Sequence, residues 1–72
     1  MEKEENMNSK LIAEKLRELR GEKSRKEVAE TLGITTSALA MYECGERIPK
    51  DEIKIKIANF YKKTVGEIFF TT

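Results

Sequence analysis

The sequence has no histidine and no tryptophan, and only one cysteine and one proline among 72 residues. A single cysteine cannot build a disulfide framework, and the lack of histidine argues against a Cys/His metal site. We therefore expect no metal, no cofactor and a reducing compartment, the cytoplasm. No apolar run approaches the roughly 18 residues that a membrane-spanning helix needs. The first ten residues are too polar for a signal peptide.

An excess of one charge sign is also missing, because 14 Lys and Arg residues nearly balance 13 Asp and Glu residues. The net charge of +1 is low for a DNA-binding domain. However, without residues 1–7 the chain carries 13 basic and 10 acidic residues. The sequence has no glycine-rich phosphate loop, and its carboxylates fit an ordinary charged surface, so we expect no enzyme.

Two short helices joined by a four-residue turn are predicted in the middle of the chain. Ser24 followed three residues later by Glu27 is the pattern of a capping box, and Gly33 suits the left-handed position after the last turn. A helix over about residues 25–32 follows from these signals. Its apolar side includes Ala29, which is small enough to let a second helix approach closely.

Thr35 can cap the second helix of this pair, which is expected to end at about Cys44. The side opposite its apolar stripe carries uncharged side chains: Thr36, Ser37, Ala40 and Met41. Two helices joined this tightly are typical of a helix-turn-helix, whose second helix enters a DNA groove. An ordinary helical bundle would show the same periodicity. The caps, the glycine stops and the short turn occur together, however, and favour DNA binding.

Basic residues lie at both ends of the helix pair. Lys23, Arg25 and Lys26 flank its start, and Arg47 and Lys50 follow its end. Side chains at these two ends can contact phosphates on either side of a groove. For four other basic residues we expect an ordinary solvated surface: Lys15, Arg17, Lys54 and Lys56.

A helix is also predicted before the pair, over about residues 10–20, with Asn8 or Ser9 as its cap. Four apolar residues form its expected buried stripe: Leu11, Ile12, Leu16 and Leu19. The preceding residues are charged and polar. We therefore predict a flexible N-terminal arm over residues 1–8 and one folded domain over residues 9–72.

A fourth helix is predicted from Asp51 to about Tyr61. Pro49 suits the chain just before a helix, and the acidic Asp51 and Glu52 suit its positive N-terminal end. Residues 53–57 alternate Ile and Lys, which is also typical of a half-buried strand. No second strand-like run exists to pair with it, so we expect a helix.

The C-terminal end combines a helix start with several apolar residues. Thr64 and Glu67 have capping-box spacing and predict a short fifth helix. Part of the apolar surface must enter the core, and an exposed remainder would be a self-association patch: Ile68, Phe69 and Phe70. Because a domain of this size is marginally stable alone, we expect a homodimer.

Taken together, these features resemble the XRE-type helix-turn-helix domain, the fold of lambda-type phage repressors and Cro proteins. The matching pattern is S-x-x-E-V-A-x-x-L-G-I-T-x-S-A-L-x-x-Y-E-x-G, with R-x-P after it and T-V-G-E-I-F-F at the end. The resemblance covers about residues 10–70. It implies an all-α, compact five-helix fold whose second and third helices form the helix-turn-helix. It also implies a bacterial or phage transcriptional regulator, most often a repressor, that binds palindromic operator DNA as a dimer.

The resemblance also implies roles for individual residues. Ser24 and Arg25 match residues that touch phosphate, and Arg20 and Glu43 match a pair that forms an internal salt bridge. Four residues match positions that face base edges: Thr36, Ser37, Ala40 and Met41.

Three departures from the family pattern bear on specificity. The turn over residues 21–23 is about two residues shorter than usual, Arg25 stands where glutamine is common, and Thr36 and Met41 replace longer amide or guanidinium side chains. Apolar contact with thymine methyl groups and recognition of DNA shape are therefore expected instead of bidentate hydrogen bonds to bases.

A second class of function stays open, namely a protein-interaction module such as an antitoxin-like or anti-repressor partner. Such a module would use the helix pair and the Phe69 and Phe70 end to hold another protein. Salt-dependent binding to duplex DNA would favour the regulator, and indifference to DNA would favour the module. For Cys44 we expect an inert residue at a helix end, with a redox switch as the alternative.

Overall fold

The structure, a computed structural model, describes residues 8–70, and these contain five helices and no strand. The helices are α1 (Ser9–Arg20), α2 (Arg25–Leu32), α3 (Thr36–Cys44), α4 (Asp51–Tyr61) and α5 (Val65–Phe69). The all-α fold and the order of its helices are confirmed, including the choice of a helix over a strand at residues 53–57. Apart from Asn8, the predicted flexible arm lies outside the described residues.

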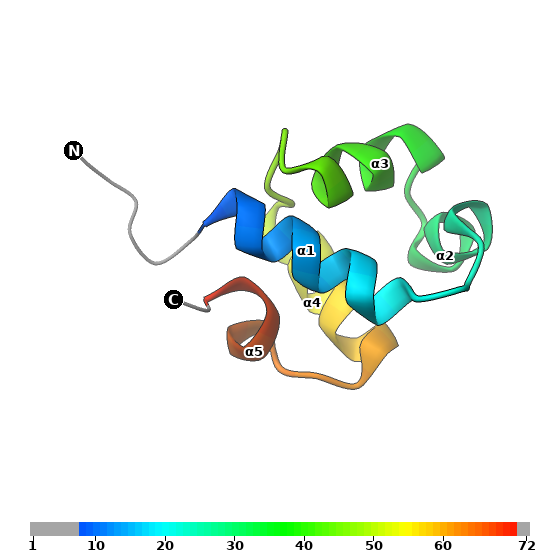
Figure 1. The fold of residues 1–72 in the computed structure, drawn as a ribbon. Helices are drawn as coiled ribbons and strands as arrows, with labels where there is room; N and C mark the ends of the chain where they lie inside the picture. The colour runs from blue at the N-terminus through cyan, green and yellow to red at the C-terminus, as the bar shows by residue number, and fades with distance from the viewer. Residues whose placement is uncertain (1–7, 71–72) are drawn as a thin grey trace.

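The long α1 runs across the middle of the molecule (Figure 1). It packs against α3 on one side and α5 on the other, while α2 contacts both α3 and α4. The start of α1 and the end of α5 lie at the same end of the molecule, opposite α2 (Figure 1). The helix pair α2 and α3 is therefore supported from behind by α1 and α4.

Local sequence signals set the ends of the helices. The side chain of Asn8 accepts hydrogen bonds from the first turn of α1, and that of Thr35 accepts the Ala38 N–H at 3.0 Å. Gly33 and Gly45 end α2 and α3 with φ angles of 76° and 80°, a region that glycine enters without strain. The predicted bounds of both helices in the pair are confirmed.

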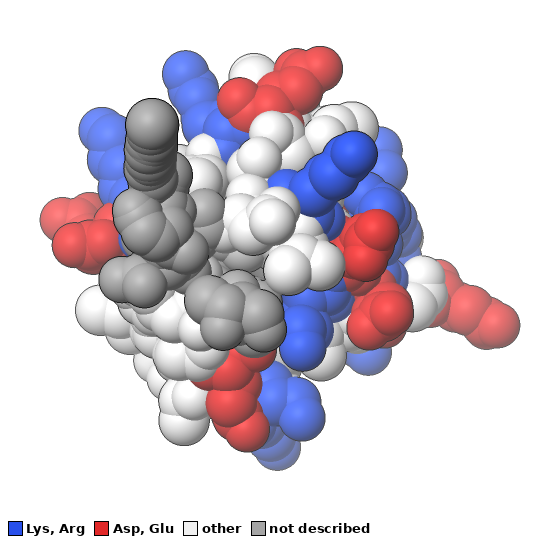
Figure 2. Space-filling view, turned by 60° about the vertical axis from the view of Figure 1, so that its left-hand side comes forward, with Lys and Arg blue, Asp and Glu red and all other residues white. Residues whose placement is uncertain are grey.

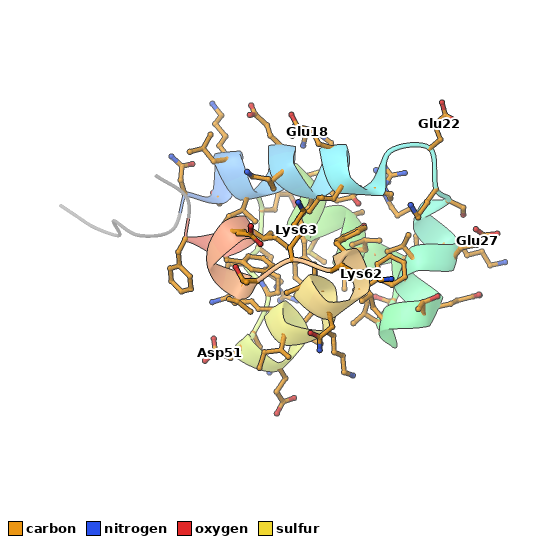
Figure 3. The ribbon with its side chains drawn as sticks, turned by 90° about the horizontal axis from the view of Figure 1, so that it is seen from below. Glu18, Glu22, Glu27, Asp51, Lys62 and Lys63 are labelled. Carbon is orange, nitrogen blue, oxygen red and sulfur yellow. The ribbon has the colours of Figure 1, made fainter. Side chains whose placement is uncertain are left out.

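The two predicted capping boxes form to different extents. At α5 the box is complete, because Thr64 Oγ1 accepts the Glu67 N–H at 3.0 Å and Glu67 Oε1 accepts the Thr64 N–H at 2.8 Å. At α2 only the first half forms, with Ser24 Oγ accepting the Glu27 N–H at 3.3 Å. The Glu27 side chain instead points outward (Figure 3).

The core takes buried apolar side chains from all five helices. Its members are Ile12, Leu16, Val28, Ala29, Leu32, Leu39, Tyr42, Ile57, Ala58, Ile68 and Phe69. The predicted stripe of α1 was wrong at Leu11, which is exposed, and it missed Ala13, which is buried. Ala13 is buried where α1 comes close to the end of α3. A Cβ atom placed on Gly45 would lie 3.3 Å from the Ser9 carbonyl oxygen and 3.8 Å from the Ala13 Cβ.

The C-terminal patch is smaller than the sequence predicted. Ile68 and Phe69 are fully buried, so they cannot contribute to a surface for self-association. Phe70 remains 45% exposed. The two side chains pack into the core, where α5 contacts both α1 and α4.

The prediction of a solvated Lys54 was also wrong. Its side chain is 8% exposed, and its ammonium lies 3.3 Å from Asp51 Oδ1. The same ammonium lies 5.6 Å from the centre of the Phe70 ring and 6.0 Å from that of Phe69, within the range of cation–π attraction. The lysine stem therefore fills space between α4 and α5 while its charge stays partnered.

Candidate nucleic-acid interface

The side of α3 that faces away from the core carries four uncharged residues, which we call the recognition face: Thr36, Ser37, Ala40 and Met41. Thr36 and Ser37 are exposed, and Ala40 and Met41 are partly exposed. Leu39 and Tyr42 lie on the other side of the helix and are buried. The recognition face is thus free to contact a partner without disturbing the core.

Helix α2 holds α3 in place. Val28, Ala29 and Leu32 form its buried side, and α2 contacts both α3 and α4 through the core. Its first turn stays outside, with Ser24 exposed and Arg25 partly exposed. This arrangement leaves the start of α2 open to a ligand while the rest of the helix is fixed.

The segment between α3 and α4 carries the other two basic residues expected near phosphate. Arg47 and Lys50 are both exposed, whereas Pro49 between them is buried. A buried proline with a fixed φ restricts the backbone of this segment. The two exposed cationic side chains therefore lie on either side of a backbone position that the buried proline constrains.

Glu43 is the most deeply buried charged residue in the described part of the chain, with 1% of its surface exposed. Its Oε2 lies 2.8 Å from Nε of Arg20, and its Oε1 lies 3.1 Å from Nε of Arg25. A buried carboxylate needs such partners, because an isolated charge in the interior costs several kcal/mol, roughly. The pairing with Arg20 is the one that the family resemblance implies, and the pairing with Arg25 was not predicted.

Arg17 joins the same site through the backbone. It donates a hydrogen bond from Nη1 to the carbonyl oxygen of Glu43, a contact that the prediction of a solvated surface residue did not include, although Arg17 is exposed as predicted. Arg20 also donates from Nη1 to the Lys23 carbonyl oxygen at 2.9 Å. We call Glu43, Arg17, Arg20 and Arg25 the glutamate cluster. It ties α1, α2 and α3 together at one point.

The sequence held a partial signal for this cluster. Arg17 and Arg20 are three residues apart on α1, so they lie on neighbouring positions of one helix face. That face packs against α3. Periodicity alone does not show which helix a charged face meets, so the contact with Glu43 required the tertiary structure.

Tyr61, at the end of α4, is close enough to the glutamate cluster for the charges of Glu43 and Arg20 to shift its pKa. Burial raises the pKa of Tyr61 above its ordinary value, the Glu43 carboxylate raises it further, and Arg20 acts in the opposite direction. The phenol therefore stays neutral through the physiological range and adds no charge to the cluster.

Away from the helix pair, acidic and basic side chains are mixed on the surface that Figure 2 shows. Figure 2 shows the side of the molecule where α1 begins and α5 ends, and there basic and acidic side chains are interspersed with uncharged surface. Mixed charge of this kind attracts a polyanion less than a surface of one sign does. Cys44 is a free, exposed thiol at the last turn of α3.

Neither a metal site nor a membrane-spanning helix is found in the described part of the chain. Within residues 8–70, no three His, Cys, Asp or Glu side chains are grouped so that they could hold a metal ion. None of the five helices there is both long and apolar enough to cross a bilayer.

Comparison with known proteins identifies a family model described as helix-turn-helix, which matches residues 14–68. Among solved structures, the SOS-response transcriptional repressor LexA of Eubacterium rectale has a TM-score of 0.79 at 17% identity. That match covers 85% of this chain and 67% of LexA. The restriction-modification controller protein C.AhdI of Aeromonas hydrophila has a TM-score of 0.75 at 25% identity and covers 85% and 91% of the two chains.

The DNA-binding domain of the P22 C2 repressor is similar over 92% of this chain and 96% of its own length, with a TM-score of 0.73 at 19% identity. This chain spans about two thirds of the LexA chain. A search of curated proteins gave no match. The structural similarities show the fold of helix-turn-helix DNA-binding transcription regulators.

Proposed function

Because this chain belongs to the XRE-type helix-turn-helix family, we propose that it binds double-stranded DNA in a sequence-dependent way and regulates transcription, as a repressor of bacterial or phage origin. The observation that carries this proposal is the recognition face. It is uncharged, it is exposed at Thr36 and Ser37 and partly exposed at Ala40 and Met41, and it lies on a helix against which α2 packs. A surface of small side chains can enter the major groove, where an α-helix fits.

In this function, the two ends of the helix pair contact the DNA backbone. Ser24 and Arg25 at the start of α2 and Arg47 and Lys50 after α3 are the phosphate contacts, and all four have exposed or partly exposed side chains. Thr36, Ser37, Ala40 and Met41 contact base edges. The alanine and methionine side chains and the threonine methyl suit contact with thymine methyl groups. Because such contacts replace bidentate hydrogen bonds to bases, part of the specificity rests on DNA shape.

A homodimer on a palindromic operator is part of the same proposal. Two copies related by a twofold axis place two recognition faces about one helical turn of DNA apart. With Ile68 and Phe69 in the core, Phe70 is the remaining member of the expected patch. A regulator of this kind acts where the DNA is, so we place the protein in the cytoplasm.

The test is selection of bound sequences from random duplex DNA, followed by titration of the selected duplex at several salt concentrations. We expect a palindromic sequence and an affinity that falls steeply as salt rises, because released counterions drive phosphate binding. Recovery of random sequences, with no salt-dependent binding, contradicts the proposal. That result, with a stoichiometric protein partner, favours a protein-interaction module.

A further inference from the structure

The glutamate cluster contains more positive charge than its own stability requires. The carboxylate of Glu43 pairs with the guanidinium groups of Arg20 and Arg25, and the backbone carbonyl oxygen of Glu43 accepts a hydrogen bond from Arg17. Three cations and one anion leave a surplus of two positive charges. A buried ion pair is complete with one cation, so the surplus points to a second anion.

Within the glutamate cluster, the exposed fraction of the side chain increases from Glu43 to Arg20 to Arg25. Glu43 is 1% exposed, the Arg20 side chain 18% and the Arg25 side chain 39%. The carboxylate is therefore out of reach of any ligand, and Arg25 is the member that an external anion can approach. The acidic residues nearest to it in sequence, Glu22 and Glu27, point outward (Figure 3).

The bond between Arg25 and Glu43 uses only the Nε–H of the arginine. A guanidinium carries five N–H donors in a rigid plane, so the four on the two η nitrogens are left. No hydrogen bond joins these nitrogens to another of residues 8–70. Fixing Nε orients the plane, and the η edge then presents two parallel donors, the geometry that suits phosphate oxygens.

We propose that Glu43 is a positioning residue for DNA binding: it fixes Arg25 through Nε so that the η nitrogens bind one phosphodiester group in a bidentate way. This inference rests on the proposed function, since it assigns the orientation of one of its phosphate contacts. It goes further because it assigns an effect on DNA affinity to Glu43, a residue that no ligand can reach.

A lysine at position 25 separates this proposal from simple charge attraction. Its three N–H donors lie tetrahedrally on one nitrogen, so a lysine bonded to Glu43 cannot also present two parallel donors to a phosphate, and the buried carboxylate competes for the ammonium. Lysine still partners Glu43, so the fold is retained. Arg25→Lys should therefore weaken binding to the selected duplex at least fivefold and lower the slope of log affinity against log salt by about one, nearly as much as Arg25→Gln.

Lys56→Gln is the matched control, because it removes one positive charge from an exposed site on α4 outside the interface. Its affinity should stay within about twofold of the wild type. A second measurement is the Nε–H resonance of Arg25, which we expect to be protected from solvent exchange with and without DNA and exposed in Glu43→Gln.

The outcomes distinguish the two proposals. If the wild type fails to bind DNA in a salt-dependent way, the proposed function is wrong. If the wild type binds and Arg25→Lys keeps its affinity and salt slope, then charge alone suffices and the positioning role of Glu43 is overturned. Loss of binding in Arg25→Lys with an unprotected Arg25 Nε–H in the wild type overturns it as well.

Discussion

At the residue scale, the stability of the helix pair depends on charged residues inside the protein. Glu43 is almost fully buried and receives its two closest charged contacts from Arg20 and Arg25. Removing one partner of a buried carboxylate leaves charge that water cannot reach, and this is costlier than losing an exposed pair. The cluster should therefore be more sensitive to substitution than the recognition face.

Arg20→Met tests this expectation. We expect it to lower the free energy of unfolding by about 3 kcal/mol, since Glu43 loses its shortest ion pair. Urea unfolding followed by circular dichroism measures the change. Arg17→Met is the matched comparison, because Arg17 bonds only to a carbonyl oxygen and its loss should cost about 1 kcal/mol. Equal small losses for both variants would show that the carboxylate does not depend on Arg20.

Lys62 is the one non-glycine residue with a positive φ, 58°, within residues 8–70. It ends α4 in the left-handed region, where a side chain is strained (Figure 3). Lys62→Gly should raise the free energy of unfolding by about 1 kcal/mol, because glycine enters this region freely.

Lys63→Gly is the control for that substitution. Lys63 has no positive φ, so glycine there only increases the entropy of the unfolded chain and should not stabilise the protein. A thermal melt separates the two. Destabilisation by Lys62→Gly would mean that the lysine side chain makes contacts worth more than the strain.

At the element scale, the sequence predicts where helices begin and end better than which faces meet. The ends of α2 and α3 follow from Thr35, Gly33 and Gly45, because capping is decided within a few neighbouring residues. Burial is decided by distant residues. Leu11 and Lys54 were assigned to the wrong environments because the sequence does not show how α5 covers α4 or how closely α3 approaches α1.

The complete capping box of α5 makes a prediction about pH. The hydrogen bond from the Thr64 backbone N–H is the main reason that the pKa of Glu67 lies below its ordinary value. A lowered pKa in the folded state means that the ionised box stabilises the fold above the unfolded value of 4.5 and that this contribution is lost as pH falls through the lower, folded value.

Glu67→Gln should therefore be less stable than the wild type at neutral pH, and the difference should shrink in acid. Unfolding titrations between neutral pH and pH 3, roughly, cover this window. Glu27→Gln at α2 is the matched variant and should lose less stability at neutral pH, because its side chain does not complete a box. A difference for Glu67→Gln that stays constant with pH would contradict this role for the carboxylate.

At the scale of the whole molecule, four large apolar side chains are exposed within residues 8–70: Leu11, Ile48, Ile55 and Phe70. Phe70 and Ile55 are exposed beside Val65 and Asp51, and together with Lys54 they line a shallow groove between α4 and α5. The sequence predicted an apolar C-terminal end but could not show that the core would take Ile68 and Phe69. Among residues 8–70, Phe70 is the largest exposed apolar side chain available for self-association.

Phe70→Ala should accordingly shift the proposed homodimer toward monomer by at least tenfold in dissociation constant, because an aromatic side chain at the centre of a small interface supplies much of its energy. Sedimentation equilibrium measures the shift. Ile48→Ala, which shortens an exposed apolar residue on the segment between α3 and α4, should leave the dissociation constant unchanged. Equal behaviour of the two variants would place any dimer interface elsewhere.

The recognition face is the central element of this account, and nuclear magnetic resonance tests it most directly. Addition of the selected duplex to the isotope-labelled protein should shift the amide signals of Thr36, Ser37, Ala40 and Met41 most strongly. Signals of Arg25 and Arg47 should follow, while those of α5 stay in place. Shifts confined to the Phe70 and Ile55 groove, with the α3 signals unchanged, would contradict it.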